Sequence, residues 1–208
     1  MTCWGGNTFT PPTGTYKAMA CHGKAGVAID STNKITACFG SDGYGSTGCA
    51  TGTEIVDASM GFWGGCAIKK SDNETFCWGP RTIYGTNSRA TESDCISRSG
   101  EGNCAAVTAT LVPSTGAKET LSCGGKRAGH FCCSLDRAGA VTCFGAGSES
   151  SYTPASSTYP TGMKTLSCGT DFCCGLSSTG DMKCFGNLNQ ADASTGTAIP
   201  ASLTGPFV

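Results

Sequence analysis

Hydrophobic and polar residues alternate in short segments of this chain, and glycine-bearing turns separate the segments. The clearest examples run from Ser134 to Thr142 and from Gly175 to Lys183. Alternation with a period of two around such a turn is typical of a β-hairpin. The sequence has no sustained helical periodicity, and no run approaches the roughly 18 apolar residues of a membrane-spanning helix. The pattern therefore predicts an all-β protein without a membrane span.

A short motif recurs along the chain and consists of a cysteine, an aromatic residue and a glycine. Its copies are Cys3-Trp4-Gly5, Cys38-Phe39-Gly40, Cys77-Trp78-Gly79, Cys143-Phe144-Gly145 and Cys184-Phe185-Gly186. Successive copies begin 35 to 66 residues apart. Because this spacing suits one small sheet per unit and is too short for independent domains, we expect a repeat protein.

Each unit begins with a Thr-Gly pair and a short strand, continues through a hairpin and ends at the Cys-aromatic-Gly motif. The two clearest copies share Leu-Ser-Cys-Gly at 121–124 and 166–169, followed by Phe-Cys-Cys at 131–133 and 172–174. Residues 1–208 hold four such hairpin units, with partial units at both ends. An insertion at about 80–117 is either a long excursion from one unit, which we favour, or a degenerate unit. The partial units lead us to expect a longer parent chain.

Cysteine content adds information on the compartment. The chain has 16 cysteines, an even number, and only 14% charged residues. This combination predicts a disulfide framework formed in an oxidising environment, and hence a secreted or cell-surface protein. Asn73-Glu74-Thr75 is an acceptor sequon for N-glycosylation in the loop of an expected hairpin, which fits the same compartment.

Hairpin geometry suggests which cysteines pair, because opposed residues of antiparallel strands lie about 4.5 to 5.5 Å apart at Cα, a distance that a disulfide tolerates. The expected cross-strand bonds are Cys66–Cys77, Cys133–Cys143 and Cys174–Cys184. Further expected bonds are Cys123–Cys132, Cys168–Cys173 and, within the insertion, Cys95–Cys104. Cys3, Cys21, Cys38 and Cys49 stay unassigned, because Val27 stands where the hairpin cysteine of their unit should be. Each loop closure of about ten residues should stabilise the fold by roughly 2 to 3 kcal/mol.

The repeat resembles that of the regulator-of-chromosome-condensation family, the RCC1-like β-propellers. The resemblance is carried by Leu-Ser-Cys-Gly, by the hairpin Cys-x-Leu with its glycine turn, and by the segment from Phe39 to Gly48 after the motif. It covers nearly all of the chain except the insertion, and its cysteine-bearing version is similar to extracellular members. The resemblance implies a β-propeller, or part of one, built of short antiparallel blades that are braced here by disulfides. The segments after Gly79, Gly145 and Gly186 depart from the family pattern.

Other motifs give weaker indications of chemistry. Gly43-x-Gly45-x-x-Gly48 has the spacing of a dinucleotide fingerprint, but that motif requires a following helix, which the sequence does not predict. The vicinal pairs at 132–133 and 173–174 could be redox or metal sites, yet Cys-x-x-Cys spacing is missing and structural disulfides explain them better. We therefore expect no catalytic residues, no cofactor and no metal. Tyr44, Phe62 and Trp63 lie among glycine and polar residues in expected loops and are the candidate binding residues.

Net charge limits the partners. A formal charge of −1 offers no general attraction to nucleic acid phosphates, so nucleic acid binding is not expected. The sequence favours a non-enzymatic extracellular module for recognition of a protein or glycan, or for scaffolding. A structural subunit of an extracellular filament or appendage, formed by self-assembly, is one alternative. A secreted inhibitor of an enzyme is another.

Overall fold

The computed structural model describes residues 12–22, 25–40, 48–61, 64–79, 117–126, 129–147, 159–186 and 202–203. Over these residues the chain forms four antiparallel sheets joined by turns, which confirms the all-β prediction. Within these ranges no helix has the length and apolar character needed to cross a membrane. Most of the predicted insertion, residues 80–116, lies outside the described ranges.

We call the sheets blades 1 to 4 in chain order. Blade 1 contains β1 (Ala18–His22), β2 (Ala25–Ile29) and β3 (Ile35–Gly40). Blade 2 contains β4 (Ile55–Met60), β5 (Gly65–Lys69) and β6 (Thr75–Trp78). Blade 3 contains β7 (Lys118–Lys126), β8 (Gly129–Asp136) and β9 (Val141–Gly147). Blade 4 contains β10 (Met163–Cys168), β11 (Phe172–Ser177), β12 (Met182–Gly186) and β13 (Ser202–Leu203). Strands follow chain order within every blade.

A tight turn with one left-handed residue joins the second and third strands of each blade. The residues with positive φ are Asn33 (62°), Asn73 (57°), Gly139 (82°) and Gly180 (84°). Glycine and asparagine are the residues that adopt this conformation at least cost, which explains their presence at this position. The alternating segments around these turns are therefore hairpins, as the sequence predicts.

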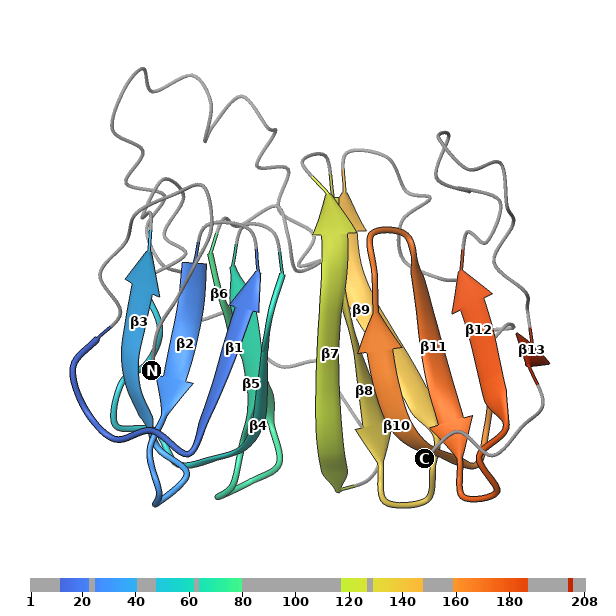
Figure 1. Cartoon of the computed structure of the whole chain (residues 1–208), viewed down its shortest axis with the longest axis horizontal. Helices are drawn as coiled ribbons and strands as arrows, with labels where there is room; N and C mark the ends of the chain where they lie inside the picture. The colour runs from blue at the N-terminus through green and yellow to red at the C-terminus, as the bar shows by residue number, and fades with distance from the viewer. Residues whose placement is uncertain are drawn as a thin grey trace.

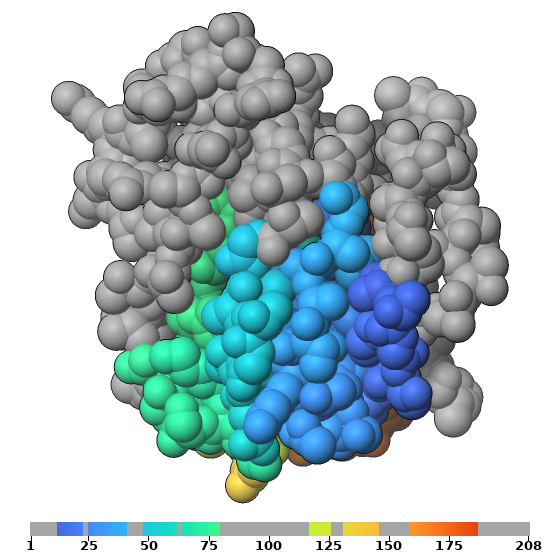
Figure 2. All heavy atoms as spheres, turned by 90° about the vertical axis from the view of Figure 1, so that its left-hand side faces the viewer, coloured from blue at the N-terminus to red at the C-terminus, as the bar shows by residue number. Residues whose placement is uncertain are grey.

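The four blades stand side by side in chain order, with their strands aligned along a common direction (Figure 1). First strands of neighbouring blades contact each other, β1 with β4, β4 with β7 and β7 with β10. Figure 2 shows the strands of blades 1 and 2 packed against each other at one end of the array. The first strands of the four blades thus form one row of neighbouring strands, and the later strands of each blade extend away from this row.

The hydrophobic core lies between the blades, in three clusters. The cluster between blades 1 and 2 includes Val27, Ile35, Ile55 and Trp78. The cluster between blades 2 and 3 includes Ile68, Leu121 and Phe144, together with four cysteines. The cluster between blades 3 and 4 includes Phe131, Leu135, Met163 and Phe185. Each blade is too small to bury much apolar surface by itself, so burial depends on its neighbour.

Aromatic residues of the Cys-aromatic-Gly motif fill these interfaces. Trp78 of blade 2, Phe144 of blade 3 and Phe185 of blade 4 each pack toward the preceding blade and are at most 8% exposed. The preceding cysteine of each motif points to the other face, because successive side chains of a strand alternate. The motif therefore supplies one packing group to each face of its blade.

Candidate functional site: disulfide-bridged blade interfaces

Six disulfides lie among the described residues. They are Cys38–Cys49, Cys66–Cys77, Cys123–Cys132, Cys133–Cys143, Cys168–Cys173 and Cys174–Cys184. The last five are pairs expected from the sequence, three as cross-strand bonds of the hairpins and two, Cys123–Cys132 and Cys168–Cys173, as bonds between the entry strand and the hairpin. All five join opposed residues with Cα atoms 4.0 Å apart. Cys3, Cys95 and Cys104 lie outside the described residues.

Blade 1 departs from the pattern of the other blades. Val27 is opposite Cys38, so no cross-strand disulfide can form at this position, and Cys38 bonds instead to Cys49 in the connection to blade 2. The Cα atoms of Cys38 and Cys49 are 6.0 Å apart. Cys21 lies on β1, opposite Gly26. The sequence left Cys38 and Cys49 unassigned, and the structure pairs them.

Strand alternation explains why vicinal cysteines make separate bonds. On β8, Cys132 is opposite Cys123 of β7, whereas its neighbour Cys133 is opposite Cys143 of β9. Because adjacent side chains of a strand point to opposite faces, the two disulfides lie on opposite faces of blade 3. The pair Cys173 and Cys174 repeats the arrangement in blade 4, with bonds to Cys168 and Cys184.

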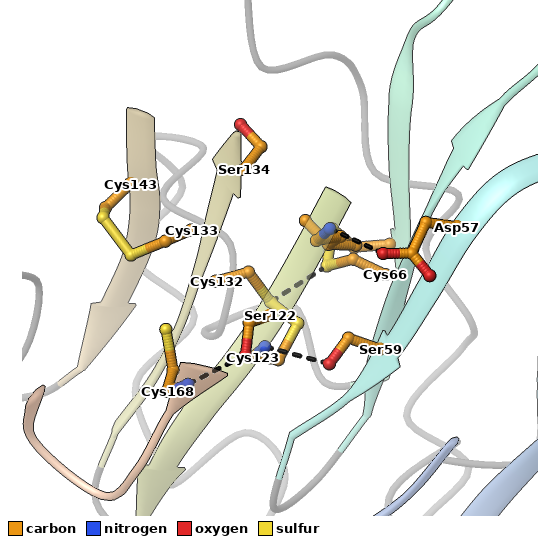
Figure 3. The surroundings of a disulfide bond; sticks show 12 residues. Asp57, Ser59, Cys66, Ser122, Cys123, Cys132, Cys133, Ser134, Cys143 and Cys168 are labelled. Atoms are coloured by element: carbon orange, nitrogen blue, oxygen red, sulfur yellow. Dashed lines mark hydrogen bonds between the residues drawn. A yellow bond between two sulfur atoms is a disulfide. The ribbon is translucent and has the colours of Figure 1, made fainter. Parts of the chain in front are cut away.

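Disulfides of neighbouring blades meet across two interfaces. Sγ of Cys66 in blade 2 lies 3.4 Å from Sγ of Cys132 in blade 3, and the same distance separates Cys133 in blade 3 from Cys173 in blade 4. Figure 3 shows the first contact beside the Cys123–Cys132 bond. Each interface brings three sulfurs within 4.8 Å of one another. The group between blades 2 and 3 contains Cys66, Cys123 and Cys132, and the group between blades 3 and 4 contains Cys133, Cys168 and Cys173. All of them are disulfide sulfurs here, whereas a metal would need thiolates.

Polar side chains join the backbones of the same blades. Three N–H groups on the edge of β7, two residues apart, donate to neighbouring blades: Leu121 to Asp57 Oδ2 (2.7 Å), Cys123 to Ser59 Oγ (2.9 Å) and Gly125 to the carbonyl of Gly169 (3.2 Å). Ser122 continues the series, since its Oγ accepts a hydrogen bond from the N–H of Cys168 at 2.9 Å (Figure 3). An unpaired strand edge is open to pairing with another chain, and these contacts satisfy the exposed edge donors.

Asp57 is the half-buried carboxylate of this arrangement. Its Oδ1 accepts a hydrogen bond from the N–H of Ala58 (2.9 Å), so one carboxylate satisfies edge donors of two blades. Burial raises the pKa of Asp57 above its ordinary value, although the two N–H donors act in the opposite direction. Asp57, Ser59 and Ser122 were missed by the sequence reasoning. The available signal was serine at the same first-strand position in three units, at 59, 122 and 167.

Lys118 is the buried cation of blade 3. The residue is 3% exposed, and its Nζ lies 5.7 Å from the centre of the Phe144 ring. Burial lowers the pKa of Lys118 to about 8, while the charge of Asp136 acts to raise it. The ring face of Phe144 offers the ammonium group an electrostatic contact where water is excluded.

The predicted binding and glycosylation residues fall in different regions. Tyr44, Phe62 and Trp63 lie outside the described residues. Asn73 is the left-handed residue of the β5–β6 turn, and Thr75 of its sequon is 1% exposed at the start of β6. The structure thus places the Asn73 sequon at a hairpin turn, as expected, and glycosylation of Asn73 stays a prediction.

One blade face is less buried than its counterparts. We define the outer face of blade 4, the face directed away from blade 3, as Thr165, Ser167, Phe172, Cys174, Leu176 and Met182, which share one side of the sheet by register. Phe172, Cys174, Leu176 and Met182 are half-buried, and Thr165 and Ser167 are exposed. Cys184, opposite Cys174 on the same side, is 8% exposed. The equivalent apolar residues of blade 3, Phe131, Cys133, Leu135 and Val141, are 0%, 0%, 2% and 7% exposed because blade 4 covers them. The outer face therefore repeats the groups of a buried interface while remaining partly open.

Comparisons with known proteins support the same architecture. Residues 163–191, which include the first three strands of blade 4, match the regulator of chromosome condensation (RCC1) repeat. No curated protein sequence matches the chain significantly.

Solved structures with similar folds include receptor ectodomains and a yeast protein. The CRINKLY WD40 ectodomain of the Arabidopsis thaliana receptor kinase ACR4 is 16% identical, with a TM-score of 0.55 over 88% of this chain and 53% of that chain. The ectodomain of the Physcomitrella patens receptor kinase CR4 is 21% identical, with a TM-score of 0.54 over 82% of this chain and 38% of that one. Prp20p from Saccharomyces cerevisiae is 14% identical, with a TM-score of 0.57 over 86% of this chain and 47% of that one. The chain spans about half or less of the length of these structures.

Proposed function

We propose that this chain, which carries RCC1-like repeats in a propeller-type fold, is a non-enzymatic extracellular module that binds a protein partner. The disulfide content supports an oxidising location, because such bonds persist in secreted and cell-surface proteins. Two of the similar structures are receptor ectodomains. Prp20p binds Gsp1p and histones, so a similar fold serves protein recognition in that case.

The outer face of blade 4 is the observation that carries the proposal. Phe172, Leu176 and Met182 are half-buried and share one side of the sheet, so this face leaves some apolar surface open for a partner. Ser167 lies beside them at the position where Ser59 and Ser122 accept backbone N–H groups of the next blade. A polypeptide with an apolar patch and an unpaired strand edge fits this chemistry better than a glycan does.

A matched pair of charge substitutions tests the proposal. Leu176→Lys places a charge in the outer face, and Ser178→Lys places the same charge in the exposed turn of blade 4. Binding of the oxidised chain to an array of extracellular proteins should identify a partner, and Leu176→Lys should weaken that binding at least about tenfold while Ser178→Lys leaves it unchanged. Equal binding by both variants would show that the outer face is not the binding surface.

A structural subunit of an extracellular filament is the second candidate, and one feature favours it. The outer face of blade 4 repeats the groups that blade 3 uses to hold blade 4, so a second copy of the chain could occupy it. Size-exclusion chromatography and electron microscopy separate the two functions, because a discrete monomer supports recognition and ordered polymers support assembly. An inhibitor would be a special case of recognition, and the array identifies it if the partner is an enzyme.

A further inference from the structure

The contacts between disulfides of different blades differ in their access to solvent. In the group between blades 2 and 3, the cysteines Cys66, Cys77, Cys123 and Cys132 are all 0 to 4% exposed. In the group between blades 3 and 4, Cys133 and Cys173 are fully buried, whereas Cys143 and Cys168 are half-buried. The second group therefore has a half-buried cysteine at each end and two fully buried cysteines in contact between them.

Thiol–disulfide exchange proceeds by attack of a thiolate on a disulfide sulfur, and its rate depends on which sulfur can be reached. Cys143 is the half-buried end of its disulfide, whereas Cys133 is fully buried, so we expect a soluble thiol to attack at Cys143. Attack at Cys143 releases Cys133 as the thiolate, which then lies 3.4 Å from Sγ of Cys173 in the neighbouring disulfide. Attack on a disulfide proceeds along its S–S axis, and Sγ of Cys133 lies beside this bond, in contact with Cys173 and within 4.8 Å of Cys168. A second exchange step therefore requires the released Cys133 side chain to rotate into line with the Cys168–Cys173 bond.

We propose that the Cys143, Cys133, Cys173 and Cys168 group is a thiol–disulfide exchange site whose substrate is a small-molecule thiol. In the first step, the thiolate of the small molecule forms a bond to Cys143 and the Cys133–Cys143 bond breaks. In the second step, the Cys133 thiolate forms a bond to Cys173 and the Cys168–Cys173 bond breaks, which releases the Cys168 thiolate. The proton lost by the small-molecule thiol ends on Cys168, so the number of disulfides is conserved.

The exchange converts two bonds within blades into one bond between blades and one mixed disulfide between Cys143 and the small molecule. Cys133–Cys173 would join blade 3 covalently to blade 4, and Cys168 would become a half-buried thiol. Ser122 holds the backbone N–H of Cys168 at 2.9 Å, which keeps the released residue at the interface. The site therefore combines a covalent link between blades with the exposure of one new thiol.

Peptide mapping of the wild-type chain tests the proposal directly. The oxidised full-length chain is treated with reduced glutathione in native buffer, trapped with an alkylating reagent, digested and analysed by mass spectrometry. We expect glutathione on Cys143, a Cys133–Cys173 cross-linked peptide and the alkylating reagent on Cys168. Alkylation of Cys168 should exceed that of Cys123 by at least about tenfold, because the equivalent group between blades 2 and 3 is closed to solvent.

Two results would overturn the proposal. One is reduction of Cys133–Cys143 without the cross-linked peptide, since the released thiolate would then not reach Cys173. The other is equal rearrangement of both groups, which would show that exchange follows unfolding of the chain.

Paired double variants provide a second test. Cys168→Ser with Cys173→Ser removes the acceptor disulfide, so glutathione should leave an alkylated Cys133 in place of the cross-link. Cys123→Ser with Cys132→Ser removes the equivalent disulfide of the other group and should leave the cross-link unchanged. Loss of the cross-link in both double variants would contradict the proposed exchange site. It would show that formation of the cross-link depends on the overall stability of the fold and not on the Cys168–Cys173 disulfide.

Discussion

At the scale of single residues, the strand face on which a side chain lies decides which blade it contacts. Asp57 illustrates the point, because its carboxylate accepts N–H groups from Ala58 of its own blade and Leu121 of the next. The hydrogen bond from Leu121 could not be derived from the sequence, since Leu121 is 64 residues away along the chain. The burial that brings these donors to Asp57 also raises its pKa.

We predict that Asp57→Asn changes the pH dependence of stability. Because the folded pKa of Asp57 lies above its unfolded value of about 3.9, the folded state binds the proton more tightly. This contribution to the free energy of unfolding is fully present below the unfolded pKa and is lost as pH rises through the folded pKa. Denaturant unfolding measured across acidic and neutral pH should show this fall in the difference in free energy of unfolding between the wild type and Asp57→Asn.

Asp72→Asn is the matched control for that measurement. Asp72 is exposed, and the backbone N–H of Glu74, followed by Ser71 and Lys69, lowers its pKa. Its contribution therefore has the opposite sign, being present above the unfolded pKa and lost as pH falls. The assignment of this pH dependence to Asp57 is wrong if the free energy of unfolding of Asp57→Asn depends on pH as it does in the wild type, while Asp72→Asn shows the change predicted for Asp57→Asn.

At the scale of the element, the first strand of each blade has an edge that no strand of its own sheet covers. In β7 the edge donors are satisfied by side chains of β4 and by the carbonyl of Gly169. The close approach to Gly169 also explains glycine at 124, because a Cβ there would overlap with the Gly169 carbonyl oxygen. Ser122 and Gly124 of the Leu-Ser-Cys-Gly segment in blade 3 are therefore interface residues, and Cys123 between them braces the strand through its disulfide.

We predict that Ser122→Ala destabilises the chain by about 1 to 3 kcal/mol, because it leaves the N–H of Cys168 without its acceptor at a partly buried interface. Ser167→Ala is the matched control, since it makes the same change at the equivalent but exposed position of blade 4 and should cost no more than about 0.5 kcal/mol. Equilibrium denaturation of both variants measures the difference. Equal destabilisation by the two substitutions would exclude interface capping as the cause.

At the scale of the whole molecule, thin sheets are held together by interfaces in which disulfides replace much of the apolar core. Cysteines make up four of the seven residues in the cluster between blades 2 and 3. Each bond closes a short loop and stabilises the chain by about 2 to 3 kcal/mol, against a typical total stability of about 5 to 15 kcal/mol for a domain. The described bonds together are thus comparable to the whole free energy of folding.

We therefore predict that full reduction unfolds the chain in native buffer. Near-ultraviolet circular dichroism should lose its fixed aromatic signal after reduction, because Trp78, Phe144 and Phe185 depend on the bridged interfaces. Intact mass before and after reduction counts the bonds through the two hydrogens that each one gains. A reduced chain that keeps a native spectrum and a cooperative unfolding transition would contradict this dependence on disulfides.

Local sequence determined the elements and most of the cysteine pairing of this protein. Alternation, turn glycines and the Cys-aromatic-Gly motif place residues on hairpins, and a hairpin places Cys133 opposite Cys143 because its register is set by a short turn. Tertiary structure decided everything that joins one blade to the next. The Cys66 and Cys132 contact, the capping of β7 by Asp57 and Ser59, and the Cys38–Cys49 bond depend on the stacking and connection of sheets, which no periodicity within one repeat encodes.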